Sequence, residues 1–209
     1  MTPAMKIGIC GGTFDPFHRG HLEPVLAARR VMQWDRLIYI PAHQQPFKSS
    51  RDLASGYHRF TMVVLATQPF EEIFVSTQEL ERGDVSYTVE TLEMLRAEHR
   101  DATLDWIIGD DNLADLDRWK NIERIFELAN FAVLARTKPA LPANLESRIS
   151  NPESRGPHGH IVLTHNTTVP ISSTEIRKRI RAGEPIVGLV DPRVSHYIDH
   201  YRLYREAQT

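Results

Sequence analysis

Short apolar runs alternate with helically spaced apolar residues along the first part of the chain. The run Lys6–Cys10 (KIGIC) contains two isoleucines and stops at a Gly-Gly pair, as a buried parallel strand does before a tight turn. From Leu22 to Met32 apolar residues recur three and four positions apart, which predicts an amphipathic helix. A second apolar run, Leu37–Ile40, ends at Pro41. This order of strand, helix and strand predicts a βαβ unit with a right-handed crossover.

The same alternation continues through the rest of the chain. Helical stretches over residues 57–66, 88–98 and 119–128 precede apolar runs at 73–75, 104–108 and 131–134, and a last strand over 160–163 precedes helices over 173–182 and from 192 onward. We therefore predict a single α/β domain over residues 1–209, with a doubly wound, mostly parallel sheet and helices on both faces. Within it, the proline-containing segment 138–159 is predicted to be a long mobile loop, and residues 171–204 a C-terminal helical part.

Composition narrows the classes of function. Of the 209 residues 41% are hydrophobic, and 25 Lys and Arg stand against 27 Asp and Glu, a formal net charge of -2. We therefore do not expect the broad positive surface of a general nucleic-acid or membrane-surface binder. Cys10 is the only cysteine, which excludes an intrachain disulfide and a cysteine-based zinc site. With no targeting segment and no apolar run of about 20 residues, we expect a soluble cytoplasmic protein, either a monomer or a homodimer.

The first turn between strand and helix carries the strongest chemical signal. It reads GGTFDPFHRGH over residues 11–21, and ligands of doubly wound sheets bind beyond the carboxyl ends of the strands. The glycines let the backbone approach a ligand, Thr13 adds a hydroxyl, and His18 and His21 share a helix face because they are three residues apart. The spacing matches neither of the common phosphate loops. At a helix N-terminus the two imidazoles could instead donate hydrogen bonds to phosphate oxygens.

Two other interpretations of the histidine pair remain open. His18 could cap the helix while His21 packs against the sheet. The H-x-x-H spacing could also hold zinc, although no Glu lies between the two histidines and the sequence offers no third ligand.

A second string, ISSTEIR over residues 171–177, opens a helix far along the chain. Ser172 and Glu175 have the spacing of a capping box, and Ser173 and Thr174 add hydroxyls beside unpaired backbone N–H groups. Arg177 follows one turn later, and its planar guanidinium suits bidentate pairing with phosphate. Alone, this string would also fit a capped surface helix with solvated arginines. Together, the two helix starts with His18, His21 and Arg177 predict a triphosphate site.

Both strings resemble signatures of one enzyme superfamily. GGTFDPFHRGH resembles the GGxFxPxHxGH signature of the adenylyltransferase branch of the nucleotidyltransferases, which carry an HxGH motif on a Rossmann-like fold, and ISSTEIR is similar to the family's ISSTxIR. The resemblance implies that His18 and His21 contact the phosphates of ATP and stabilise the transition state. It implies that Arg177 holds the leaving pyrophosphate and that Mg²⁺ binds mainly through the ATP phosphates. The ATP-binding residues that it implies are Gly11, Gly12, Thr13, Phe14, Gly109, Asp111, Ile171, Ser172, Ser173 and Thr174. Arg136 is a further candidate, because it follows a predicted strand and could lie near the adenine.

The middle of the chain carries a further resemblance, which concerns the acceptor. Residues 84–92 (DVSYTVETL) resemble the PSYTxxTL segment of bacterial nicotinate-mononucleotide adenylyltransferases, with Asp84-Val85 in place of Gly-Pro, and IIGDDNL and RWK resemble that family's IIGxDxL and RWK elements. The resemblance runs from Lys6 to Tyr204, except for the segment 138–159. It implies adenylyl transfer from ATP to nicotinate mononucleotide, giving nicotinate adenine dinucleotide and pyrophosphate, a step of NAD biosynthesis.

Five residues are candidates for binding the acceptor: Lys48, Tyr87, Thr88, Trp119 and Lys120. Trp119 could stack on a pyridine ring, and helix starts near Thr88 and Trp119 could receive its carboxylate. Trp119 could equally be ordinary helix packing, and Asp111 a helix cap. Lys48 follows Phe47, where the family usually has histidine. Other acceptors such as phosphopantetheine, a non-catalytic nucleotide-binding protein and a metal hydrolase also remain open.

Overall fold

Seven parallel strands form the central sheet. In the computed structural model, which describes residues 4–46, 53–135, 142–165 and 169–205, the strand order is β3-β2-β1-β4-β5-β7-β6, and every neighbouring pair is parallel. The strands are β1 (Lys6–Gly12), β2 (Arg36–Pro41), β3 (Ile73–Val75), β4 (Thr103–Gly109), β5 (Asn130–Ala135), β6 (Ile149–Ser150) and β7 (Ile161–His165). The predicted mostly parallel sheet is therefore confirmed.

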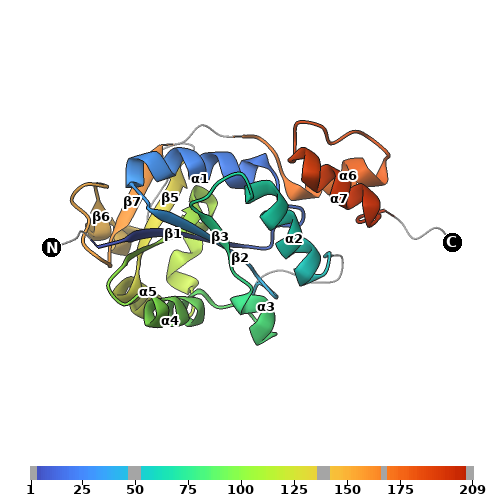
Figure 1. The fold of residues 1–209 in the computed structure, drawn as a ribbon. Helices are drawn as coiled ribbons and strands as arrows, with labels where there is room; N and C mark the ends of the chain where they lie inside the picture. Colours follow the sequence, from blue (N-terminus) through green and yellow to red (C-terminus); the bar gives the residue numbers. More distant parts are fainter. Residues whose placement is uncertain (1–3, 47–52, 136–141, 166–168, 206–209) are drawn as a thin grey trace.

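Helices cover both faces of this sheet (Figure 1). One face carries α1 (Arg19–Met32) and α2 (Gly56–Thr67), and the other carries α3 (Gln78–Arg82), α4 (Thr88–Glu98) and α5 (Ile122–Leu128). Short 3-10 helices, η1 (Asp110–Arg118) and η2 (Ala143–Arg148), precede α5 and β6, and α6 (Ser173–Arg181) and α7 (Pro192–His200) follow β7. No helix in these described ranges is long and apolar enough to cross a membrane.

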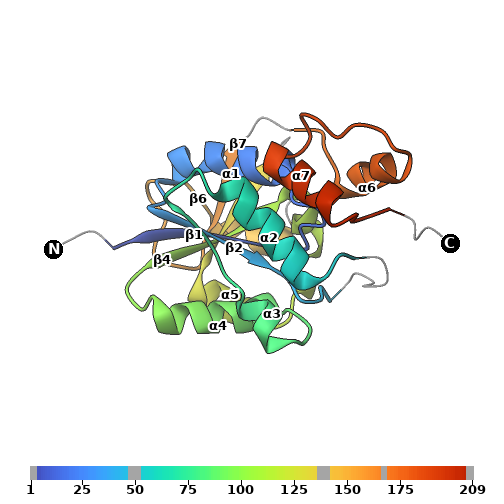
Figure 2. The same cartoon turned by 45° about the vertical axis from the view of Figure 1, so that its right-hand side comes forward.

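Alternation along the buried strands supplies a core on each face. In β2, Ile38 and Ile40 pack in the cluster that contains α4 and α5, whereas Leu37 and Tyr39 pack in the cluster that contains α1, α2, α6 and α7. Successive side chains of a strand point to opposite faces, so a continuous apolar run marks a strand covered on both sides. Figure 2 shows α7 beside α2, on the α1 face of the sheet.

The strand order reverses at β1, which lies between β2 and β4. Ile9 is opposite Trp106 in the register, so three residues further along each strand Gly12 lies level with Gly109. Ligands of doubly wound sheets bind outside the carboxyl ends of the strands at such a reversal. The turn after β1 and the turn after β4 therefore border the expected binding site, and α6 and α7 lie beyond the same end of β1 (Figure 1).

Two local expectations differ from the structure. The helix expected over 119–128 begins only at Ile122, because Trp119 ends η1 in an extended conformation and Asn121 is left-handed (φ 53°). The described part of the segment 138–159 contains η2 and β6, and β6 pairs with β7. Elements of two to six residues are too short to leave a periodic pattern in the sequence.

Candidate active site

His18 and His21 come together at the start of α1. His18 is the N-cap residue in an extended conformation, and its backbone N–H donates to Nδ1 of His21 at 3.3 Å. The two rings stack with centroids 3.7 Å apart. Because Nδ1 of His21 accepts a hydrogen bond, the proton of the neutral ring lies on Nε2. The expected pair of imidazoles at a helix N-terminus is therefore present.

The ring of His18 is buried, and it lies against Gly20. His18 as a whole is 5% exposed, and among the described residues the Nδ1 atom of its ring has no hydrogen-bond partner. Loss of solvation lowers the pKa of His18 to about 4, so the ring is neutral at pH 7. A Cβ atom at Gly20 would lie 3.0 Å from two atoms of this ring and 3.4 Å from the carbonyl oxygen of Val169. Glycine in the H-x-G-H string thus leaves room for the His18 ring.

This stacking disfavours zinc binding by the histidine pair. A metal binds an imidazole nitrogen along the lone pair, which lies in the plane of the ring. The planes of His18 and His21 are inclined by only 24°, so an ion between them would lie out of both planes. Moreover, Nδ1 of His21 already accepts the backbone N–H of His18.

Phe14 contributes backbone rather than side chain to the first turn. Its φ is 53°, an uncommon conformation for a bulky residue, and its buried ring packs edge-on against Phe17, His21 and Tyr39. A Cβ atom at Gly12 would lie 2.8 Å from that ring. Any contact of Phe14 with ATP would therefore come from its peptide groups.

The second motif docks directly on the first. Ser172 caps α6 by accepting the backbone N–H of Glu175 at 3.2 Å, which is one half of the expected capping box. The Glu175 carboxylate accepts from Nε of Arg179 at 3.2 Å. The hydroxyl of Ser173 donates to the carbonyl oxygen of Pro16 at 3.1 Å, and Nη1 of Arg177 donates to the carbonyl oxygen of Asp15 at 2.6 Å. The guanidinium of Arg177 is thus held at the first turn and not extended into solvent.

Other described residues expected at ATP lie along the same end of the sheet. The Thr13 hydroxyl donates to the Gln45 side chain at 2.8 Å, and Ile171 packs at the edge of the core on the α1 face. At the end of β4, a Cβ atom at Gly109 would collide with the carboxylate of Asp111, which accepts from the side chain of Asn112 at 3.0 Å. Arg136 and Lys48 lie outside the described residues.

The acceptor candidates form a separate group at the start of α4. Tyr87 is the N-cap residue of α4, and the Lys120 ammonium lies 4.0 Å from the centroid of its ring. The same ammonium pairs with Glu90 at 2.6 Å. Thr88 begins α4, so its backbone N–H is one of those that the helix leaves unpaired. One face of Tyr87 is therefore covered by a positive charge.

Trp119 differs from its expected position. It does not open a helix, and the helix start that was expected near it lies three residues later, at Ile122. Its half-buried ring packs edge-on against Phe131, with centroids 5.8 Å apart. Trp119 therefore packs on the core from outside a helix, and the helix packing that was its alternative interpretation is not observed. The exposed part of the ring is what a ligand could contact.

Sequence reasoning missed a buried arginine that joins two loops. Arg59, on α2, donates to the carbonyl oxygens of Thr13 at 2.7 Å, Ala54 at 3.1 Å and His43 at 3.4 Å. Burial lowers its pKa, and the charge of nearby Asp15 opposes that effect. The sequence does contain a signal for this role: Arg59 is a charged residue on the apolar side of the helix predicted over residues 57–66. A buried charge normally has a partner.

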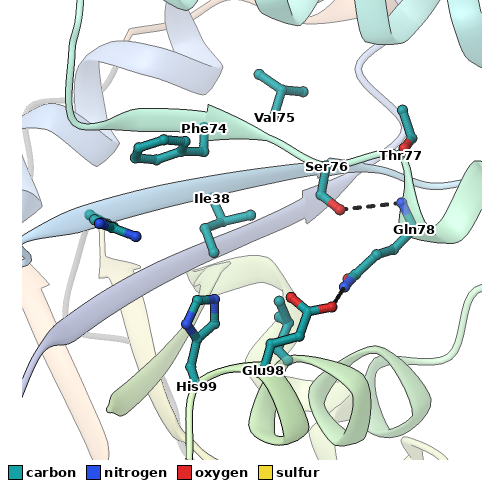
Figure 3. Close-up of a pocket in the computed structure, with 10 residues that line it drawn as sticks. Ile38, Phe74, Val75, Ser76, Thr77, Gln78, Glu98 and His99 are labelled. Atoms are coloured by element: carbon teal, nitrogen blue, oxygen red, sulfur yellow. Dashed lines mark hydrogen bonds between the residues drawn. The ribbon is translucent and has the colours of Figure 1, made fainter.

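A groove lies at the β3 edge of the sheet (Figure 3). It measures about 310 Å³, and Phe74 and Arg36 line one side, with the guanidinium 5.2 Å from the Phe74 ring centroid. The side chain of Gln78 bridges toward Glu98 at 2.8 Å. The groove shares no residue with either motif.

Comparison with known proteins agrees with these motifs. A model of the cytidylyltransferase-like family matches residues 9–179. A protein of Chromobacterium violaceum is 37% identical over 209 residues, covering 96% of this chain and 99% of its own length. One of Clavibacter sepedonicus is 34% identical over 204 residues, covering 98% and 96%. Each is named "probable nicotinate-nucleotide adenylyltransferase".

A solved structure has the same fold. The Plasmodium falciparum nicotinic acid mononucleotide adenylyltransferase, in its complex with NaAD, superposes with a TM-score of 0.73 at 22% identity and covers 96% of this chain and 97% of its own. The α/β architecture with a parallel sheet is therefore that of a known nucleotidyltransferase. Since relatives at 34–37% identity span nearly the whole chain and both motifs meet at one turn, the chain belongs to the nicotinate-nucleotide adenylyltransferase family.

Proposed function

We propose that this chain transfers the adenylyl group of ATP to nicotinate mononucleotide, forming nicotinate adenine dinucleotide and pyrophosphate in NAD biosynthesis. The observation that carries this proposal is the contact between α6 and the turn that precedes α1, from Ser173 to Pro16 and from Arg177 to Asp15. Because of these contacts the N-termini of α1 and α6 meet at the reversal of strand order. Two helix N-termini with imidazole and guanidinium donors suit a polyphosphate.

In this reaction a phosphate oxygen of nicotinate mononucleotide attacks the α-phosphorus of ATP. A new P–O bond forms, the bond from the α-phosphorus to the bridging oxygen of the β-phosphate breaks, and pyrophosphate leaves with that electron pair. Catalysis of such a transfer is mainly positioning and stabilisation of developing negative charge. We therefore propose direct transfer between the substrates, with no covalent intermediate on the enzyme.

We assign the phosphates to His18, His21 and Arg177. The imidazoles of His18 and His21 would donate hydrogen bonds to phosphoryl oxygens, and Arg177 would hold the leaving pyrophosphate. For the remainder of ATP, we propose contacts with the backbone of residues 11–14, with the α6 start (Ile171, Ser172, Ser173 and Thr174), and with Gly109 and Asp111 at the end of β4. The packing of Gly20 against His18 and the docking of Arg177 on Asp15 support preformed positions for these groups.

The start of α4 is the proposed binding place for the acceptor. Tyr87 is the N-cap residue of this helix, Thr88 begins it, and Lys120 lies over the Tyr87 ring. Trp119 directly precedes Lys120 in the sequence, and the names of the full-length relatives specify nicotinate nucleotide. The ammonium of Lys120 and the unpaired N–H groups of α4 favour a carboxylate over a neutral amide. Preference for the acid would therefore be electrostatic.

Magnesium fits this site through the phosphates of ATP. The chain offers hydrogen-bond donors at both helix starts, and within the described ranges no three His, Cys, Asp or Glu side chains are grouped to hold a metal. Mg²⁺ commonly keeps phosphate oxygens and water as most of its ligands. When bound in that way it supplies neutralisation of the phosphate charge, while His18, His21 and Arg177 orient the same phosphates.

The test is pyrophosphate release from Mg-ATP with nicotinate mononucleotide, beside nicotinamide mononucleotide and a reaction without acceptor. We expect fast release with the acid and much slower release with the amide. His21→Ala should lower turnover by about 10²–10³-fold, the range for loss of one transition-state donor. His196→Ala, an exposed histidine on α7, is the matched control and should leave turnover unchanged. Absence of release with either acceptor would refute the proposed function.

A further inference from the structure

A buried carboxylate lies beside Arg177 without bonding to it. Asp15 is 2% exposed, and its Oδ1 accepts hydrogen bonds from the Tyr204 hydroxyl at 2.6 Å and from the Ala54 backbone N–H at 3.1 Å. Its Oδ2 lies 3.7 Å from Nη1 of Arg177 and, among the described residues, has no hydrogen-bond partner. A separation of 3.7 Å is an ion pair but too long for a hydrogen bond.

The guanidinium shows the complementary arrangement. Nη1 of Arg177 donates to the carbonyl oxygen of Asp15, and its Nε is buried with no hydrogen-bond partner in the described part of the chain. A buried arginine next to a carboxylate normally forms a short, often bidentate pair. Here Oδ2 of Asp15 and Nε of Arg177 both lack a hydrogen-bond partner among the described residues, although the two side chains are only 3.7 Å apart.

Tyr204 accounts for this separation. Its hydroxyl and the Ala54 N–H both bond to the same carboxylate oxygen, which fixes the carboxylate of Asp15. Tyr204 itself is held after α7 by a left-handed conformation (φ 64°), by packing in the core of the α1 face, and by the neighbouring bond from the Leu203 N–H to the Ile198 carbonyl oxygen. The carboxylate cannot turn toward Arg177 without losing the bond to Tyr204.

We propose that Tyr204 is a positioning residue that holds the Asp15 carboxylate away from Arg177, so that the guanidinium is available to the polyphosphate. This inference rests on the proposed role of Arg177 in holding pyrophosphate. A carboxylate that closed on Arg177 would occupy its donors and neutralise its charge, and it would compete with the substrate. Tyr204 therefore acts through Asp15 on Arg177 and has no direct role in the chemistry.

The test compares pyrophosphate binding by calorimetry, and the KM for ATP, in three variants of the full chain. Tyr204→Phe removes the hydroxyl and should weaken pyrophosphate binding by about 10-fold, the size expected when a hydrogen bond to a charged group decides the outcome. Adding Asp15→Asn should restore binding toward wild type, because a neutral amide cannot pair ionically with Arg177. Tyr197→Phe is the control, since it removes a hydroxyl that bonds His58 on the same surface, 2.9 Å away.

The double variant separates positioning from a merely structural role. If Tyr204 only stabilised the fold, Asp15→Asn would add to the damage, and the melting temperature would fall together with binding. Unchanged pyrophosphate binding in Tyr204→Phe, or still weaker binding in the double variant, would overturn the inference. A wild-type chain that binds pyrophosphate but does not use nicotinate mononucleotide refutes the proposed acceptor alone, whereas one that binds no pyrophosphate refutes both proposals.

Discussion

Arg155 donates from Nη2 to Oδ2 of Asp105 at 2.8 Å, in an ion pair whose side chains are 2% and 0% exposed. The carboxylate also accepts from Nε1 of Trp34 at 2.6 Å and from Nδ2 of Asn130 at 2.9 Å. Arg155 further donates to the carbonyl oxygen of Met32 at 3.0 Å. The segment expected to be a long mobile loop is therefore anchored through Arg155 to β4 and to the end of α1.

Loss of this anchor should destabilise the whole domain. Arg155→Met leaves the Asp105 charge buried without its cation, and breaking such a pair costs about 3–5 kcal/mol. Arg179→Met, which removes a half-exposed pair with Glu175, should cost less than about 1 kcal/mol. Urea unfolding of both variants measures the difference. Equal, small losses would show that the buried pair contributes no more than a surface pair.

The buried imidazole of His18 should make stability depend on pH. Burial lowers its pKa from 6.5 to about 4, so the folded protein favours the neutral ring. The contribution of the neutral ring to the free energy of unfolding is complete above pH 6.5, where the ring is neutral in both the folded and the unfolded protein. It is lost as the pH falls from there through about 4, a change of about 3 kcal/mol. Unfolding free energies across this range should fall more steeply for the wild type than for His18→Asn. An imidazole NMR titration with a midpoint near 6.5 would contradict this prediction.

Gly20→Ala should separate activity from stability. The added Cβ would lie 3.0 Å from the His18 ring, which must shift away from its position at the first turn. A displacement of this kind should reduce turnover by about 10²-fold. The close contact with the His18 ring lowers stability, whereas alanine favours the helix over glycine by up to about 1 kcal/mol. Because these two effects oppose each other, the melting temperature should change little. Turnover equal to wild type would show that the His18 position is not critical.

Lys120→Met should reduce the preference for an acidic acceptor. In the wild type the Lys120 ammonium pairs with Glu90 at 2.6 Å, whereas Arg82 approaches Glu90 only to 3.4 Å. Removal of the ammonium therefore leaves a negative charge beside the start of α4. The KM for nicotinate mononucleotide should rise about fivefold, while that for the amide stays nearly constant. Arg118→Met, two residues earlier in an exposed pair with Asp115, is the matched control. A parallel rise for both acceptors would point to lost packing instead of charge.

The elements that the sequence predicts best are those with a strong local pattern. The helix expected over 88–98 and the strand over 73–75 coincide with α4 and β3, because their periodicity or apolar run ends at clear boundaries. The two motifs could be recognised because each is a continuous string with unusual composition. The pattern predicted too early a start for the helix, because Trp119 keeps helical spacing to Ile122 and Phe126. The left-handed conformation of Asn121 separates Trp119 from this helix.

What the sequence could not predict are single contacts between distant residues. The pairs Asp15 with Tyr204 and Asp105 with Arg155 join positions 189 and 50 residues apart. Each depends on the completed packing of several elements and leaves no periodic trace. The same holds for Arg59, whose three carbonyl partners come from two different loops.

The docking of α6 on the first turn also bears on how the protein is made. The contacts from Ser173 to Pro16 and from Arg177 to Asp15 span 157 and 162 residues. A nascent chain on the ribosome can therefore pair all seven strands before the second motif has emerged, and it then lacks Arg177 and the start of α6. Synthesis must pass residue 177 before the proposed phosphate site is complete, so we expect chains that end earlier to be inactive.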